Sequence, residues 1–321
     1  MASETQGKLD EARRAYSPVA HHCSLLFFLV SKLVQADVMY QYSLTWFLQL
    51  FHLALDDFRG RADDDQEPSG EEEAEAIGID HLAEYFTHEL YSNVCRSLFE
   101  KDKLLFSFLL AAKLAQARGD LAPGEYASLV ETEDGLSENA PGLSKLKQEW
   151  SNWLPAARWR TLCQMATRSA PMAAVVDDFD KHVDQWRVVI DSKRPMSEEF
   201  PTIQLGDEER QLGNFTKLCL VKALIPGRFV PAVREYVVQE RGERYLKPPL
   251  FDIERSYDDS TSATPLIFVL PGADPLQALT AFAKRKKKFE SLRSISLGQG
   301  QGARAEQAVA EARKQGGWVL L

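Results

Sequence analysis

The glycines near the end of the chain form the pattern most typical of chemistry. Gly298, Gly300 and Gly302 follow a short apolar run and precede a helical pattern, as in a phosphate-binding loop. Such a loop binds phosphate through backbone N–H groups at a helix N-terminus, and in nucleoside triphosphatases a GK[ST] lysine adds charge. Here the spacing is G-x-G-x-G, no GK[ST] follows, and the loop comes after the second expected strand. We therefore interpret it as a tight, closely packed strand-to-helix turn, with nucleotide binding by residues 298–302 as the alternative.

The first expected strand-to-helix turn is the usual place for phosphates, and it lacks the residues for that chemistry. Its sequence, LPGADP at 270–275, has one glycine, Gly272, and no lysine at the helix start. Asp274 and Pro275 fit the N-cap and the first position of a helix. Because the aspartate places negative charge where a phosphate would bind, we expect Pro271, Gly272, Asp274 and Pro275 to form a degenerate loop without nucleotide.

The other residues that could form binding, metal or catalytic sites are better explained by structural roles. The basic run KRKKK at 284–288 lies at the end of an expected helix, where cations favour the helix dipole, although an anion patch or nuclear signal is the alternative. The sequence His21-His22-Cys23 has no second ligand pair nearby, and no HExxH or GxSxG motif occurs. The four cysteines are scattered, which favours packing roles in a reducing compartment. We therefore expect no metal site and no catalytic residue in this chain.

The elements that would position these residues are helical over most of the chain. Apolar residues at helical spacing predict helices over 24–36, 44–55, 80–119, 146–165, 172–190, 210–224 and 230–241. Residues 119–145 and 191–209 are expected to be loop and connector. The apolar run SLLFFLV at 24–30 is interrupted by Lys32 and Asp37, so we expect a core helix rather than a membrane span.

The pattern changes near residue 264. An apolar run at 264–270, a helical pattern at 275–288, a run at 291–297, a helix at 303–315 and a final run at 318–321 predict consecutive βαβ units with a parallel sheet. With only three strands, such a sheet leaves its edges bare. The expected fold is therefore mainly α-helical, with a C-terminal partial α/β subdomain that looks truncated.

Most of the negative charge is local. The chain has a net charge of −9, and residues 56–75 account for −8 of it through ten acidic residues and two arginines. We interpret residues 56–76 as a solvated, disordered acidic loop. The rest of the chain is near neutral and has no global field that would attract nucleic acid.

Five long segments closely resemble dynein heavy chains and occur in the same order near the C-terminal end of the motor ring. They are YSPVAHHCSLLFFLVSKLVQADVMYQYSLTWFLQLF (16–51), CRSLFEKDKLLFSFLL (95–110), TPLIFVLPGADP (264–275), ISLGQGQGARAE (295–306) and GGWVLL (316–321). The segments MYQYSLTWF and EKDKLLFSFLL are more similar to axonemal than to cytoplasmic dyneins.

The resemblance implies an AAA+ architecture with four parts. Residues 1–55 would be the end of the fifth module, a small helical subdomain that follows a coiled coil. Residues 56–76 would be an acidic insertion, residues 77–263 the helical region leading into the sixth module, and residues 264–321 part of its α/β core. In the family the PGADP position does not bind ATP. The ATP-hydrolysing modules, stalk and linker of the family lie outside this sequence, so the resemblance also implies that the chain is a fragment of a longer protein.

The implied function is that of the parent protein, an ATP-driven microtubule motor of cilia and flagella. This segment would be a non-catalytic ring part that relays conformational change, with no cofactor of its own and with ATP and Mg²⁺ in the parent motor. Implied partners are the other AAA+ modules and, through the parent, intermediate and light chains and microtubules, without nucleic acid or membrane. Implied locations are the cytoplasm, cytoskeleton and axoneme. A free-standing adaptor fragment is a further alternative.

Overall fold

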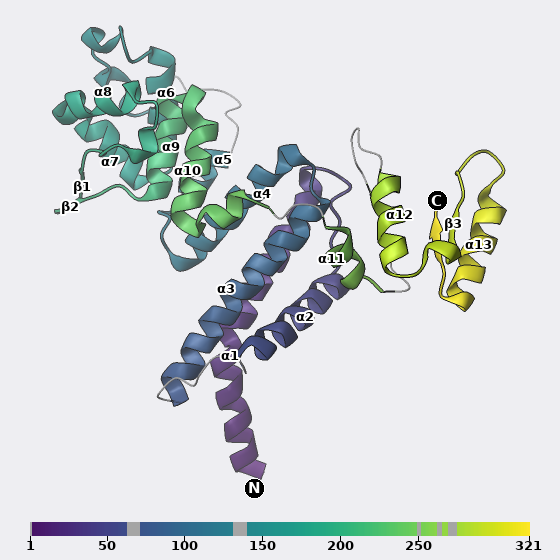
Figure 1. Cartoon of the computed structure of the whole chain (residues 1–321). Helices are drawn as coiled ribbons and strands as arrows, with labels where there is room; N and C mark the ends of the chain where they lie inside the picture. Colours follow the sequence, from purple (N-terminus) through teal and green to yellow (C-terminus); the bar gives the residue numbers. More distant parts are fainter. Residues whose placement is uncertain (1, 63–70, 131–139, 249–251, 262–264, 269–274) are drawn as a thin grey trace. The chain divides into compact units, whose positions relative to one another are not determined.

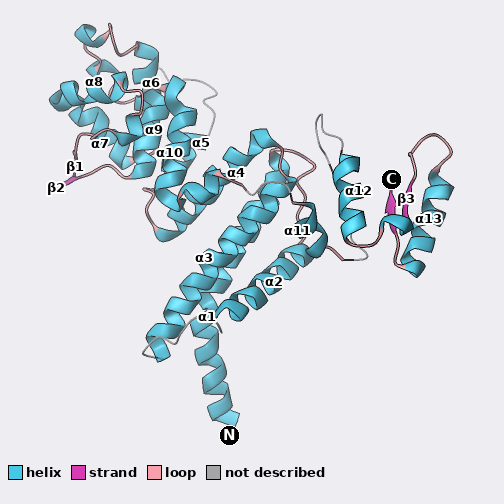
Figure 2. Ribbon diagram, viewed as in Figure 1, coloured by secondary structure: helices cyan, strands magenta, loops and turns pink. Residues whose placement is uncertain are grey.

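A computed structural model of the chain describes residues 2–62, 71–130, 140–248, 252–261, 265–268 and 275–321. The chain divides into two compact units, Met1–Pro249 and Leu250–Leu321. The first is almost entirely helical, and the second contains helices and a small parallel sheet (Figures 1 and 2). This confirms the expected fold class.

Three long helices begin the first unit: α1 (Ala2–Ser31), α2 (Leu44–Ala62) and α3 (Glu71–Ser97). Both α1 and α2 pack against α3. The ring of Phe86 on α3 meets those of Phe47 and Phe51 edge-on, at centroid distances of 5.3 and 5.1 Å. Edge-to-face contacts of this kind stabilise packing beyond the apolar area they bury, so these rings hold α2 on α3.

The segment Tyr16–Gln35 consists of the end of α1 and the 3₁₀ turn that follows it, Lys32–Gln35. By length and mean hydropathy it is long and apolar enough to cross a membrane. Lys32 lies within this segment and Asp37 beyond it, so these two residues do not by themselves exclude a membrane span. The segment nevertheless supplies Leu26, Leu29, Val30 and Leu33 to the core of the unit. A buried apolar face of this kind is what a core helix also needs.

The expected single helix over 80–119 is two helices, α3 and α4 (Glu100–Arg118). The chain is extended at Phe99, and the Phe99 N–H donates to the hydroxyl of Tyr40 at 3.0 Å. That hydroxyl donates in turn to Asp102 at 2.6 Å. A tyrosine from a distant loop thus takes the place of a capping residue, which the local sequence does not reveal.

Helices α2 and α3 also extend into the acidic segment that was expected to be a loop from 56 to 76. Residues 56–62 belong to α2 and residues 71–76 to α3, whereas 63–70 lie outside the described residues. On α2, Asp57 accepts a hydrogen bond from Tyr85 of α3, and Phe58 lies 5.8 Å from the Tyr85 ring. These contacts favour helix where composition alone favoured loop.

The rest of the first unit is a cluster of shorter helices around aromatic side chains. They are α5 (Glu125–Val130), α6 (Ala156–Ala166), α7 (Ala170–Asp178), α8 (Val183–Asp191), α9 (Asn214–Leu224) and α10 (Phe229–Arg241). Trp150, Trp159 and Trp186 are buried, and Trp153 is partly buried. Phe179 contacts all four tryptophans. The expected loop and connector contain α5 and an antiparallel hairpin, β1 (Ile203–Leu205) and β2 (Glu208–Arg210).

The second unit contains α11 (Ile253–Asp258), α12 (Pro275–Arg285), β3 (Leu292–Ser294), α13 (Gly302–Gln315) and β4 (Trp318–Leu320). Strands β3 and β4 pair in parallel, with Leu292 opposite Trp318. This confirms the expected βαβ connection. Tyr257, Phe282 and Trp318 pack together, with centroids 5.2–5.4 Å apart, and join α11, α12 and the sheet.

The expected first strand at 264–270 is not formed in its described part. Residues 265–268 have no regular structure, and the Ile267 side chain is 83% exposed. β-Branched composition favours a strand only when a neighbouring strand accepts its hydrogen bonds. The prediction of a strand was therefore wrong for these residues.

Candidate functional site

The glycine loop lies between β3 and α13, where the sequence placed it. The Gln301 N–H donates to the Gly298 carbonyl at 3.1 Å, which closes a four-residue turn. Gly300 lies third in that turn with φ of +83°, a conformation that favours glycine. A Cβ on Gly298, Gly300 or Gly302 would meet no atom within 4 Å. The tight turn is thus present, but the expected close packing is not.

Backbone donors of this loop are partly used within it. The N–H groups of Gly298 and Gln301 donate to Ser296 and Gly298 carbonyls, and the Ala305 N–H donates to Gln301. A phosphate loop works by directing such groups at the anion. The geometry therefore favours a connecting turn over a phosphate grip.

The other expected site residues fall largely outside the described part of the chain. Pro271, Gly272 and Asp274 are not described, and Pro275 is seen only as the first residue of α12. The expectation that this degenerate loop holds no nucleotide stays a prediction.

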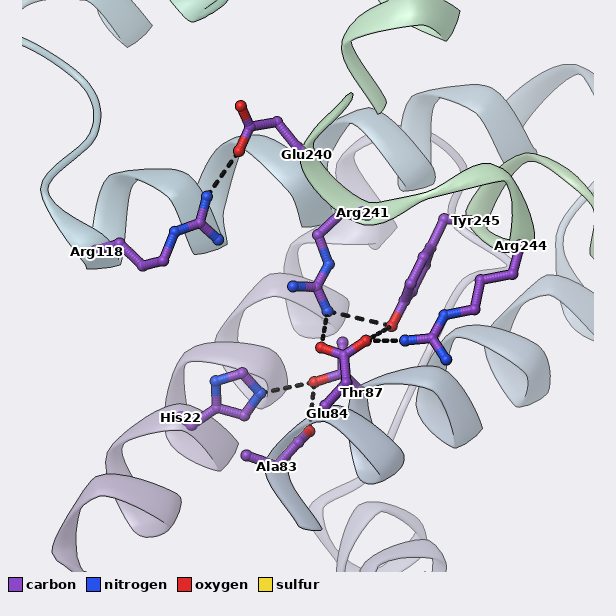
Figure 3. Close-up of polar contacts among 9 residues, drawn as sticks. All are labelled: His22, Ala83, Glu84, Thr87, Arg118, Glu240, Arg241, Arg244 and Tyr245. Carbon is purple, nitrogen blue, oxygen red and sulfur yellow. Dashed lines mark hydrogen bonds and ion pairs between the residues drawn. The ribbon is translucent and has the colours of Figure 1, made fainter. Parts of the chain in front are cut away.

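The first unit contains a polar cluster that the sequence did not indicate, shown in Figure 3. Its centre is Glu84 on α3. The carboxylate forms ion pairs with Arg241, at the end of α10, and with Arg244, in the short turn Glu243–Leu246. One of its oxygens also accepts a hydrogen bond from the Tyr245 hydroxyl at 3.0 Å. A single carboxylate thus binds three side chains from a segment about 160 residues later.

Helix α1 joins the same region through His22. The Thr87 hydroxyl donates to the Ala83 carbonyl at 2.7 Å, as a threonine on a helix often does. Its single proton is then used, so His22 Nε2, at 2.7 Å, is the donor to Thr87 Oγ1. Burial, and secondarily the charge of Arg241, lowers the pKa of His22. The lowered pKa favours the neutral imidazole, in the tautomer that carries its proton on Nε2.

The backbone carbonyl of Tyr245 is hydrogen-bonded as well as its side chain. Its carbonyl accepts hydrogen bonds from Tyr91 Oη on α3 and from Ser107 Oγ on α4, both at 2.7 Å. All three residues are buried. Because a buried polar group without a partner costs about 1–3 kcal/mol, this arrangement fixes the turn after α10 against α3 and α4.

Beside the cluster lies an open cavity of about 440 Å³, lined among others by His21, His22, Asp80, Glu84, Arg118 and Arg241. Its cations are already paired. Arg241 binds Glu84, and Arg118 binds Glu240 at 2.7 Å. With two carboxylates also in the lining, the cavity offers no net charge for an anionic ligand. The arrangement suits a structural clamp between helices rather than acid–base or nucleophilic chemistry.

Residues considered for metal or thiol chemistry are separated or buried. Among the described residues, no group of three or more His, Cys, Asp or Glu side chains is placed to hold a metal ion. His81 is exposed, whereas His88 lies edge-on against Tyr245. Cys95, Cys163 and Cys219 are buried, and burial raises the pKa of Cys163 to about 11. A thiol held in its neutral form is a poor nucleophile and ligand.

Sequence spacing could not reveal the cluster. Glu84, Arg241 and Arg244 look like ordinary charged residues on helix surfaces, and about 160 residues separate the two sides. The one local signal is the concentration of Arg241, Arg244 and Tyr245 around Gly242, where α10 ends.

Comparison with known proteins assigns the second unit to a class. Residues 261–321 match a family model described as "Dynein heavy chain region D6 P-loop domain". This agrees with the parallel βαβ connection of β3, α13 and β4. The chain thus combines a helical region with part of a P-loop α/β domain.

Relatives match the first unit as well. The chain is 34% identical over 323 residues to human dynein axonemal heavy chain 3 and 35% identical over 325 residues to human dynein axonemal heavy chain 1, and both matches span the whole chain. It is 38% identical over 243 residues, 75% of its length, to human dynein axonemal heavy chain 12. The chain belongs to the dynein heavy chain family. It spans only 7–8% of the length of these relatives.

Proposed function

We propose that this chain is a non-catalytic part of the AAA+ ring of an ATP-driven microtubule motor, and that it relays conformational change within that ring. The observation that carries the proposal is the match of the whole chain to axonemal dynein heavy chains. We assign residues 1–55 to the end of the fifth module, 56–76 to an acidic insertion, 77–263 to the helical region before the sixth module, and 264–321 to part of its α/β core.

The clamp around Glu84 supports the relay role. It joins α1 and α3 to α10 and the following turn, so movement of the early helices is transmitted to the segment that precedes the P-loop-like unit. Rigid helices joined by buried polar contacts are one physical means of coupling. In the contact between Thr87 and His22 the imidazole donates its proton to the hydroxyl, so His22 does not act as a base toward Thr87, which fits a mechanical role.

The proposal assigns cofactors and partners to the parent protein. ATP and Mg²⁺ would bind in other modules, and this segment would need neither. Its direct partners would be the remaining modules of the same heavy chain. Microtubules and the intermediate and light chains would be reached through the parent, in the cytoskeleton of the axoneme.

Calorimetric titration of the chain with MgATP tests the non-catalytic assignment. We expect no binding tighter than about 1 mM, because the glycine loop uses part of its backbone donors itself and no GK[ST] lysine follows it. The nucleotide-binding alternative predicts micromolar affinity that is lost in Gly300→Val. Gly206→Val is the matched control, since Gly206 also has a positive φ, +66°, and a Cβ there also meets no atom within 4 Å.

A chimera tests the motor assignment. The matching segment of human dynein axonemal heavy chain 3 would be replaced by this chain, and ATP-driven microtubule gliding would be measured. We expect gliding to be retained and to slow when Glu84→Ala is added. Retained gliding that is indifferent to Glu84→Ala would contradict the relay role, and loss of gliding by the unmutated chimera would contradict the family-based assignment.

A further inference from the structure

The basic run at 284–288 remains unexplained by any role in the ring. Cations in the last turn of a helix favour its dipole, but α12 ends at Arg285, and Lys286, Lys287 and Lys288 lie beyond it. Residues 284–321 carry nine Lys and Arg against three Glu, a net charge of +6 in a chain of net charge −9. The last turn of α12 already contains two cations, Lys284 and Arg285, and three more lysines follow directly, which exceeds what one helix end needs.

The fold adds further cations to the run. Lys288 Nζ donates to the Gly316 carbonyl at 2.9 Å, just past the end of α13. Helix α12 leads into β3, and α13 leads into β4. Because the two strands are parallel, both helices end at the edge of the sheet where the strands begin (Figure 1). We call this surface the basic end; it consists of Lys284, Arg285, Lys286, Lys287, Lys288, Arg313 and Lys314.

Local acidic residues neutralise only part of this charge. Arg285 lies 3.5 Å from Glu254, and Lys286 lies 3.4 Å from Asp258. The Lys287 and Arg313 side chains are exposed and make no ion pair with residues that the structure describes. The basic end therefore keeps an unneutralised excess of positive charge.

Lys287 occupies a position that normally takes glycine. The Lys288 N–H donates to the Ala283 carbonyl and the Lys287 N–H to the Lys284 carbonyl, which together form the Schellman ending of a helix. Lys287 has φ of +55° in this motif, whereas α4 and α13 place Gly119 and Gly316 in the left-handed position at their ends. A lysine here is less favourable than glycine for the backbone, so folding alone does not account for it.

We infer that the basic end is a docking surface for a short acidic peptide segment of a protein partner. The remaining excess charge, spread over two helix ends, matches a segment with several Asp or Glu residues. The net negative charge of the chain repels a long polyanion. A short peptide bound at the basic end is attracted by the nearby cations, whereas acidic residues more than one Debye length away, ~8 Å, are largely screened from it. Tyr257, Phe282 and Trp318 pack on one another, which leaves them poorly placed to stack on nucleic acid bases.

Fluorescence anisotropy with a labelled octaglutamate peptide and the full chain tests this inference. At about 50 mM NaCl we expect binding that weakens strongly at about 200 mM NaCl. The triple variant Lys287→Gln, Arg313→Gln, Lys314→Gln is expected to lose about tenfold in affinity. A control with the same charge change, Arg160→Gln, Lys193→Gln, Arg234→Gln, is expected to change affinity by less than about twofold.

Lys287→Gly separates binding from folding. Glycine suits the left-handed position, so circular dichroism melting should show an unchanged or higher Tm, while peptide affinity falls by about threefold. A variant that folds at least as well yet binds less tightly cannot owe its defect to misfolding.

Four results would overturn the inference. They are absence of peptide binding at low salt, an equal loss in the control triple variant, unchanged affinity in Lys287→Gly, and tighter binding to octauridine RNA or phosphatidylserine vesicles than to the peptide under the same conditions.

Discussion

Glu125 is a carboxyl group that the fold removes from water. Its side chain is 1% exposed, and its two oxygens accept hydrogen bonds from Thr216 Oγ1 at 2.5 Å and from the Ala122 N–H at 2.9 Å. Burial raises the pKa of Glu125, and the two hydrogen bonds oppose that shift. The folded state therefore holds the proton of Glu125 more tightly than the unfolded chain does.

The pH dependence follows from that direction. Below about pH 4.5, the ordinary value for this carboxyl, the group is protonated in both states and favours folding. As pH rises through the higher pKa of the folded state, the unfolded chain has already released the proton, and this contribution to stability is lost. Glu125 should thus make the chain less stable at pH 8 than at pH 5.

We predict that Glu125→Gln removes this dependence. The amide can keep both contacts, because its oxygen can accept from Ala122 and its NH₂ can donate to Thr216. The variant should gain about 1 kcal/mol at pH 8 and little at pH 4.5, measured by urea unfolding. Glu149→Gln, an exposed carboxyl, is the control. A loss of stability in Glu125→Gln at pH 8 would show that the ionised form is the one the fold favours.

At the scale of elements, α3 is the helix on which the first unit depends. It packs against α1 and α2, its Thr87 contacts His22 of α1, and its Glu84 and Tyr91 contact α10 and the turn after it. Arg241 is the most buried cation in this network, with 11% of its side chain exposed, and its Nε has no hydrogen-bond partner among the described residues. Loss of Glu84 would also remove the carboxylate that pairs with this guanidinium.

We predict that Glu84→Ala destabilises the first unit by about 1–3 kcal/mol, because it leaves a buried cation without its carboxylate. A double-mutant cycle of Glu84→Gln with Arg241→Gln should show coupling, measured by urea unfolding. The comparison cycle is Arg118→Gln with Glu240→Gln, where Arg118 is 45% exposed. Coupling there should be under about 1 kcal/mol, and equal coupling in both pairs would contradict a central role for Glu84.

At the scale of the whole molecule, the two units differ in how much apolar surface they bury. Among the described residues of the second unit, the buried apolar side chains are Phe282, Ala283, Ala305 and Ala308, whereas Ile267 is 83% exposed, Leu297 65% and Leu321 53%. Its sheet pairs β3 with β4 among the described residues. Exposed apolar side chains beside open strand edges favour association with other chains.

We predict that the isolated chain self-associates at concentrations of tens of micromolar. Light scattering after size-exclusion chromatography would measure this, and Ile267→Lys with Leu297→Lys should reduce it. The matched control, Val188→Lys, changes an apolar residue of the first unit that is 60% exposed. A monodisperse chain with one sharp cooperative melt would instead favour the free-standing adaptor alternative.

Local patterns determined much of this protein. Helical spacing predicted α9, α10 and α12 close to their observed bounds, and the repeated apolar runs predicted the parallel pairing of β3 with β4. The turn at Gly300 followed from glycine alone. These features depend on interactions within a few residues, or on a short connection, so the sequence contains the information directly.

Tertiary structure alone decided the features that depend on distant partners. The division between α3 and α4 needs Tyr40, and the clamp at Glu84 needs Arg241 and Arg244. In both cases the deciding energy is a hydrogen bond or an ion pair with a group far away in the chain. Sequence spacing does not encode such a partner, because only folding brings the two groups within contact distance.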